Sequence, residues 1–215
     1  INLDEISDGK LYETNDLVKL GCGDCAGCSA CCHEMGDTII LDPYDVYRMT
    51  TGMGKSMQEL LAASVELNVV DGVILPNLKM LGTKEACAYL DEEGRCSIHP
   101  YRPGICRLFP LGRYYENGGF SYFLQTGECA KENRSKIKVS KWIDTPDLTR
   151  NQQFTLQWHD LLHAMEERLT GEDEGKQQEE NLLLLRLFYL LPYKGTTDFY
   201  SQFMERMEYW NEQIR

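Results

Sequence analysis

The chain has no apolar run long enough to cross a membrane. Its densest hydrophobic stretch, residues 182–191, is ten residues long and contains Arg186, whereas a spanning helix needs about 20 apolar residues. Basic residues are also scarce: 22 Lys and Arg stand against 34 Asp and Glu, and the formal net charge is −12. Binding to nucleic acid or to an anionic membrane needs a basic excess. We therefore expect neither partner.

No signal peptide is visible, because the first residues show no basic region followed by an apolar stretch. The chain begins at Ile1 rather than at a methionine. Because no export signal is visible, the expected location is the cytoplasm. All nine cysteines lie between Cys22 and Cys129. In a reducing compartment, clustered cysteines are metal or redox sites more often than disulfides. The cysteine region therefore predicts a metal site.

The densest cysteine cluster is made of Cys22, Cys25, Cys28, Cys31 and Cys32. Cysteines two residues apart wrap a loop around one metal in both zinc ribbons and ferredoxins. Three such steps plus an adjacent fifth cysteine exceed what one tetrahedral zinc ion uses. The spacing therefore favours iron–sulfur centres over zinc. Because the two adjacent cysteines would point to opposite faces of an extended chain, we expect Cys31 and Cys32 to serve different centres.

A second group of cysteines follows, Cys87, Cys96, Cys106 and Cys129. Pro103 suits the first turn of a helix, which would place Cys106 near the positive end of that helix and favour its thiolate. Nearby arginines would offset the negative charge of a thiolate-bound centre: Arg95, Arg102, Arg107 and Arg113.

The histidines are less informative than the cysteines. His99 either completes a Cys-x2-His pair with Cys96 or hydrogen-bonds a turn, and His33, which follows the double cysteine, is a further candidate ligand. His159 and His163 are one helical turn apart but lack the glutamate of a metalloprotease helix. They are expected to lie on a helix surface. No catalytic residue is identified.

Local patterns in the first 145 residues predict short helices and strands. Asp42 with Pro43 begins a helix to about Met49, and Ser56 caps a second helix through Val65. Strands are expected over 38–41 and 69–75, the latter with a turn at 71–72, and short strands alternate with turns after residue 87. A hairpin is expected over 112–124, with Asn-Gly at its bend. Residues 1–20 are expected to form a surface segment and the basic stretch 131–145 a solvated linker.

The last third of the chain is expected to be helical. Apolar residues follow the spacing of one helix face in 154–169 and again in 199–214. Residues 182–191 are apolar almost all round, which predicts a central helix packed on several sides. The sequence therefore predicts an α+β protein. Its first part is a small cysteine-rich metal-binding domain over residues 1–145, and a helical C-terminal region, 146–215, packs on that domain. That helical region also offers a surface for a protein partner.

The double cysteine and the block His-Pro-x-Arg-Pro-x2-Cys, residues 99–106, resemble the CxxCxxCC cysteine-cluster family, described as a zinc- or iron-chelating domain. The resemblance covers about residues 22–130. It implies eight metal-binding residues, and it leaves Cys22 as an extra: Cys25, Cys28, Cys31, Cys32, Cys87, Cys96, Cys106 and Cys129. The family also includes flagellin lysine methylases, which implies methyl transfer as one activity.

The sequence thus predicts a protein that carries one or two iron–sulfur clusters, of the 4Fe–4S kind, for electron transfer or redox chemistry. Two alternatives stay open: a zinc-stabilised binding module, and a protein methyltransferase similar to the flagellin lysine methylases. The chain shows neither a Gly-rich nucleotide-binding turn nor a Cys-x3-Cys-x2-Cys signature, so whether it is an enzyme stays open as well.

Overall fold

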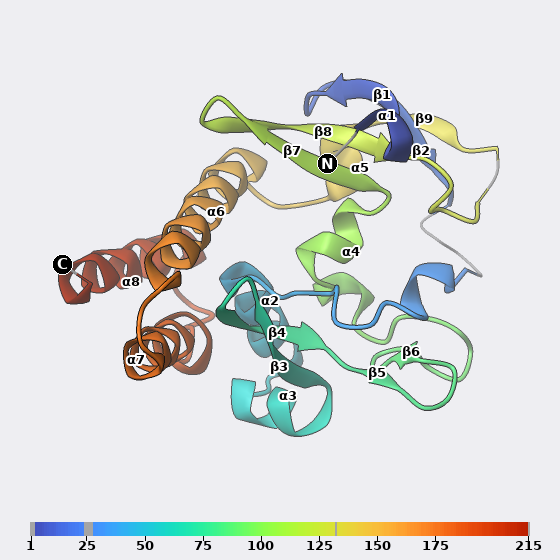
Figure 1. The fold of residues 1–215 in the computed structure, drawn as a ribbon. Coiled ribbons are helices and arrows are strands. Elements are labelled where there is room, and N and C mark those ends of the chain that lie inside the picture. The colour runs from blue at the N-terminus through green and yellow to red at the C-terminus, as the bar shows by residue number, and fades with distance from the viewer. Residues whose placement is uncertain (1–2, 24–27, 132, 215) are drawn as a thin grey trace.

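The computed structural model describes residues 3–23, 28–131 and 133–214. The fold is α+β, with short antiparallel strands in the first two thirds and a helical C-terminal region, as predicted. In Figure 1 the long helices gather on one side, and the strands form separate small sheets above and below the short helix α4, Gly104–Leu108. No helix among these residues has the length and apolar character needed to cross a membrane.

The upper sheet combines segments from opposite ends of the first 140 residues (Figure 1). A short helix, α1 (Leu3–Ile6), leads into β1 (Ser7–Tyr12), which pairs with β8 (Gly119–Gln125). Most of residues 3–20 are exposed, which agrees with the predicted surface segment, but the strands in this range were not predicted. The reason is that their partner strand lies more than 100 residues away and leaves no local signal.

A second pair of strands corrects the prediction of a basic linker. β2 (Leu17–Gly21) pairs with β9 (Ser135–Lys138), and α5 (Val139–Ile143) follows directly. Val139 and Ile143 are buried. The apolar residues between the lysines of this stretch therefore pack inward, while the lysines face solvent.

The predicted hairpin is confirmed. β7 (Leu111–Glu116) pairs with β8 around a turn at Asn117 and Gly118, both with positive φ. Positive φ at two central residues is the requirement of the tight hairpin turn that Asn-Gly favours.

The two predicted capped helices are also confirmed. Asp42 caps α2 (Pro43–Met53) and Ser56 caps α3 (Met57–Ala63), each through a reciprocal capping box. The segment predicted as one strand with a turn is a full hairpin, β3 (Val65–Val70) with β4 (Val73–Leu78). Residues 38–41 form only an isolated bridge between Ile40 and Asn77, so the strand predicted there is wrong.

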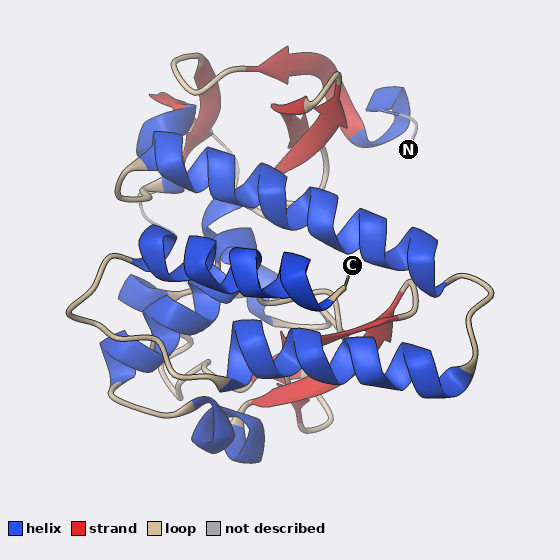
Figure 2. Cartoon of the chain, turned by 90° about the vertical axis from the view of Figure 1, so that its left-hand side faces the viewer, coloured by secondary structure: helices blue, strands red, loops and turns tan. Residues whose placement is uncertain are grey.

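The C-terminal region contains three long helices, which lie across the molecule in Figure 2: α6 (Leu148–Leu169), α7 (Glu174–Leu185) and α8 (Phe199–Gln213). A π-helical turn, Arg186–Leu190, extends α7. Leu184 and Phe188 are completely buried, but Leu182 is 62% exposed. Residues 182–191 are therefore packed on several sides, as predicted, while the side of α7 that carries Leu182 faces solvent.

Two hydrophobic clusters hold these elements together. The larger one joins residues 39–98 to the C-terminal helices, with Val46, Met49 and Leu78 packed in the same cluster as Phe154 and Phe188. The smaller one lies under the upper strands and includes Leu20, Leu111 and Tyr122. Helix α4 touches both, because Leu108 belongs to the smaller cluster and Cys106 packs against the larger. The segment that carries Cys106 is thus positioned by both clusters.

Candidate metal centre

The cysteines reach one cavity from five segments of the chain. Cys22 follows β2, and Cys28 precedes a 3-10 turn, Ala30–Cys32, that carries the adjacent pair. Cys87 ends β6 (Ala86–Cys87), which pairs with β5 (Met80–Leu81). Cys96 lies in the loop before a second 3-10 turn, His99–Tyr101, and Cys106 lies in α4.

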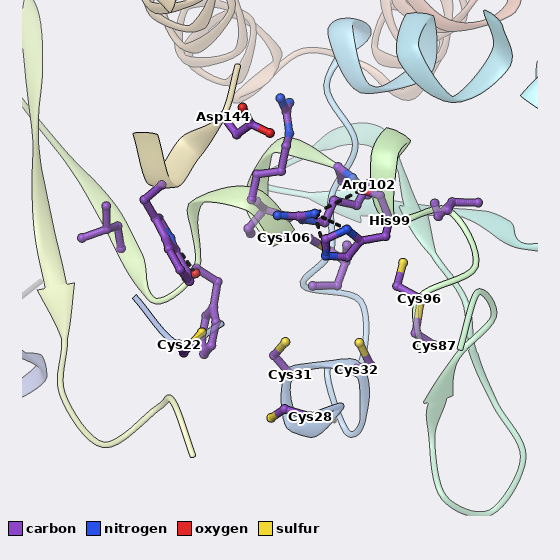
Figure 3. Close-up of a pocket in the computed structure, with 18 of the residues that line it drawn as sticks. Cys22, Cys28, Cys31, Cys32, Cys87, Cys96, His99, Arg102, Cys106 and Asp144 are labelled. Carbon is purple, nitrogen blue, oxygen red and sulfur yellow. Dashed lines mark hydrogen bonds between the residues drawn. The ribbon is translucent and has the colours of Figure 1, made fainter. Parts of the chain in front are cut away.

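The cavity has a volume of about 810 Å³, and seven of its lining residues are cysteines: Cys22, Cys28, Cys31, Cys32, Cys87, Cys96 and Cys106. Figure 3 shows Cys31 and Cys32 rising from their turn toward the cavity, with Cys87 and Cys96 on a neighbouring loop and Cys22 on the far side. All seven are half-buried. Cys129 does not line the cavity, although the adjacent Glu128 does. Cys25 falls outside the described residues.

The adjacent cysteines do not sit on extended backbone, which corrects the premise of the sequence argument. In their 3-10 turn the side chains of Cys31 and Cys32 hydrogen-bond each other. This bond lowers the pKa of Cys31, which the positive charge of Arg102 also lowers, and it raises the pKa of Cys32. The pair therefore loses a first proton easily and holds the second. Whether the two sulfurs serve one centre or two stays a prediction.

Cys87 and Cys96 have the same local arrangement. The backbone N–H of Tyr89 donates to the sulfur of Cys87, and the backbone N–H of Ile98 donates to that of Cys96. Both donors are two residues after their cysteine. Burial raises the pKa of both thiols, and these N–H bonds oppose that effect by favouring the thiolate. The loops therefore already direct backbone donors at the sulfurs, as metal-binding cysteine loops do.

The environment of Cys106 corrects another expectation. Helix α4 has only five residues, and burial raises the pKa of Cys106, with the negative charge of Asp45 as the next cause. Free Cys106 is therefore a thiol, and a metal would have to displace its proton. Cys31, Cys87 and Cys96 line the same cavity as Cys106, and their negative charges also raise its pKa.

Charged side chains surround these sulfurs. Arg95, Arg102 and Arg107 line the cavity as expected, whereas Arg113 lies elsewhere, with its guanidinium 5.5 Å from the Phe120 ring centre. The sequence argument missed Arg48, which also lines the cavity. Arg48 lies in the middle of α2 with no special spacing, so no local signal would have identified it.

The histidines divide between the cavity and the surface. The guanidinium of Arg102 lies against the His99 ring, with Nη1 2.8 Å from Nδ1 and 2.7 Å from Nε2, and His99 lines the cavity. His33 does not line it; its Nδ1 lies 3.4 Å from the carbonyl oxygen of Lys84. His159 stacks on Tyr115, with ring centres 3.8 Å apart. The ligand role of His99 stays a prediction.

The donor set fits a metal by its chemistry. Seven soft sulfur donors around one cavity suit zinc or iron–sulfur centres rather than hard cations. As the side chains stand, no group of three or more His, Cys, Asp or Glu among residues 3–23, 28–131 and 133–214 is arranged to hold a metal ion. Ligation would therefore need the side chains, or the turn that carries Cys28 to Cys32, to adjust.

Comparison with known proteins gives one match. No curated protein and no solved structure matches the chain. One family does: CxxCxxCC, described as a zinc- or iron-chelating domain, over residues 24–135. This range includes every cysteine of the chain except Cys22 and spans just over half of the sequence. The chain therefore belongs to the CxxCxxCC family of zinc- or iron-chelating domains.

Proposed function

We propose that the cavity holds an iron–sulfur centre and that the protein serves electron transfer or a redox reaction. The observation that carries this proposal is the convergence of seven thiols on one cavity. A structural zinc ion uses four ligands and leaves no room for more. Seven thiols exceed that need and match a cluster or a pair of clusters.

The surroundings of the sulfurs support the same proposal. The N–H bonds of Tyr89 and Ile98 and the nearby charge of Arg102 stabilise negative charge on sulfur. Hydrogen bonds to sulfur and local charge are what set the potential of an iron–sulfur centre. The cavity volume of about 810 Å³ is also far more than one bare ion needs.

The residues that would hold the centre are those that the family resemblance implies, of which five lie close to one another: Cys31, Cys32, Cys87, Cys96 and Cys106. When bound, the centre supplies one-electron chemistry. The chain's own residues shield and orient it. Trp142 and Phe109 line the same cavity, and the Trp142 Nε1–H donates to the Leu108 and Phe109 carbonyl oxygens at 3.2 Å. These hydrogen bonds hold the indole in place on the cavity wall.

Metal analysis tests the proposal. The protein should be purified without oxygen and assayed for iron, zinc and acid-labile sulfide. We expect a brown protein in which iron and sulfide are present in comparable amounts. Stoichiometric zinc without sulfide would overturn the proposal and favour a zinc-stabilised binding module. Methyl transfer stays a prediction of the resemblance to flagellin lysine methylases.

A further inference from the structure

Two arginines form one wall of the cavity. Arg48 comes from α2 and Arg107 from α4, and both line the cavity. Their guanidinium carbons lie 6.0 and 5.8 Å from the centre of the same ring, that of Tyr44. Burial lowers the pKa of Arg48, and repulsion from the charge of Arg107 lowers it further. Two like charges held together in this way call for a nearby anion.

Each of these arginines has a buried donor without a partner. Arg48 Nη2 donates to the Pro100 carbonyl oxygen at 2.5 Å, and Arg107 Nη1 donates to Thr145 Oγ1 at 2.8 Å. Arg48 Nη1 and Arg107 Nε are buried and have no hydrogen-bond partner in the part of the chain that the structure describes. Arg107 is only 4% exposed. Unpaired buried donors on charged groups are costly, so an acceptor that reached them would be held strongly.

Among the residues that the structure describes, no carboxylate accepts a hydrogen bond from Arg48 Nη1 or Arg107 Nε. Asp45 Oδ1 lies 3.9 Å from Arg107 Nη2, too far for a hydrogen bond, and already accepts the Gly104 N–H at 2.6 Å. Asp144 lines the cavity and acts on Arg48 through its charge. The cavity nevertheless carries more cations, Arg48, Arg95, Arg102, Arg107 and Lys141, than carboxylates, Glu128 and Asp144.

We propose that Arg48 and Arg107 form a binding subsite for a small organic anion, whose carboxylate or phosphate group lies between the two guanidinium groups. The fork of donors on arginine matches the oxygens of either group. The volume of about 810 Å³ lies in the range of small-molecule sites and leaves space for an organic body next to the sulfurs. Ile105, which also lines the cavity, is 39% exposed.

This inference deepens the proposed function and rests on it in one respect. The anion would be the substrate, or part of it, that meets the centre held by the cysteines. The alternative is that the arginines only balance the negative charge of the thiolates and the centre, in which case no further anion binds.

Calorimetric titration of the anaerobically purified protein tests the subsite. The probes are inorganic phosphate and acetate, each added as the sodium salt at constant ionic strength. We expect saturable binding of at least one of them, in about the millimolar range because a bare ion makes few contacts. Tighter binding of phosphate would assign a phosphorylated ligand, and tighter binding of acetate would assign a carboxylate.

Two variants and one control sharpen the test. Arg48→Gln should weaken binding about tenfold or more, because a charged donor pair is lost, and Arg48→Lys should weaken it less. Arg168→Gln is the control, since Arg168 is a similarly half-buried arginine that pairs with Glu180 on the far helices. Absence of saturable binding by the unmodified protein, or equal binding by Arg48→Gln, would overturn the proposal.

Metal assays on the same samples separate this proposal from the proposed function. Phosphate or acetate binding without iron and sulfide would leave the anion subsite standing and remove the iron–sulfur centre. Iron and sulfide without anion binding would overturn the anion subsite and support the iron–sulfur centre. Loss of iron from Arg48→Gln, with no anion binding by the unmodified protein, would assign the arginines to charge balance alone.

Discussion

The carboxylate of Asp45 accepts the backbone N–H of Gly104 at 2.6 Å and so joins helix α2 to helix α4. Asp45 is 2% exposed and is also part of the capping box of α2, where it accepts the Asp42 N–H. Two residues after Gly104 comes Cys106. One buried carboxylate therefore starts α2 and positions the segment that brings a sulfur to the cavity.

Removing this carboxylate should destabilise the protein. Asp45→Ala leaves the Gly104 N–H without its acceptor and removes the negative charge that lies 3.9 Å from the buried Arg107 guanidinium, and we expect a loss of about 2–4 kcal/mol in the free energy of unfolding. Urea unfolding followed by circular dichroism measures it. Glu59→Ala is the matched control, because Glu59 has the same place in the capping box of α3 but is exposed. Its effect should be clearly smaller. Equal effects would show that the bridge to α4 contributes nothing.

The cysteines should differ in their importance for metal. Cys106→Ser should lose metal, since Cys106 shares one neighbourhood with three other sulfurs in the cavity. Cys22→Ser should keep it, because Cys22 lies outside the family match, although it lines the cavity. Iron and sulfide per chain, measured after anaerobic purification, show whether each variant keeps its metal. Loss of metal from Cys22→Ser would make this ninth cysteine a ligand.

Removing the metal should loosen the cysteine loops and leave the large hydrophobic cluster intact. Helices α2 and α3 pack with the C-terminal helices, so their stability comes from apolar burial that needs no metal. After chelation, hydrogen exchange should speed up in 28–32 and 80–106. Exchange in 43–63 and 148–213 should change little. Uniform loss of protection along the chain would contradict this division.

The ring stack between α6 and the hairpin should contribute to stability. His159 lies on Tyr115 with an interplanar angle of 10°, whereas the next histidine on the same helix, His163, is 59% exposed. His159→Ala should lower the free energy of unfolding by about 0.5–1.5 kcal/mol. His163→Ala, the control, should change it by less than about 0.5 kcal/mol. Thermal and urea unfolding measure both. If both variants lower the free energy of unfolding by the same amount, the stack does not contribute to stability.

Features that depend on neighbouring residues were predictable. The caps at Asp42 and Ser56 and the Asn117-Gly118 bend are set by local hydrogen bonds and φ preferences. The helical spacing of apolar residues in 154–169 and 199–214 likewise needs no knowledge of the partner. Strands β1 and β9 were not predicted. Their pairing depends on partners that are distant in the sequence, and the residues of β1 and β9 are mostly polar.

The cysteine spacing by itself predicted a metal-binding protein, because adjacent Cys-x2-Cys steps have few other uses in a loop, and the double cysteine with residues 99–106 carried the resemblance to the CxxCxxCC family. Only the tertiary structure decided which groups meet at one cavity. It brought Arg48 of α2 and Trp142 of α5 to the sulfurs and left Cys129 away from them. The reason is physical: spacing along a loop limits which ligands can share one metal, whereas neighbours from distant segments are chosen by the packing of two hydrophobic clusters around α4.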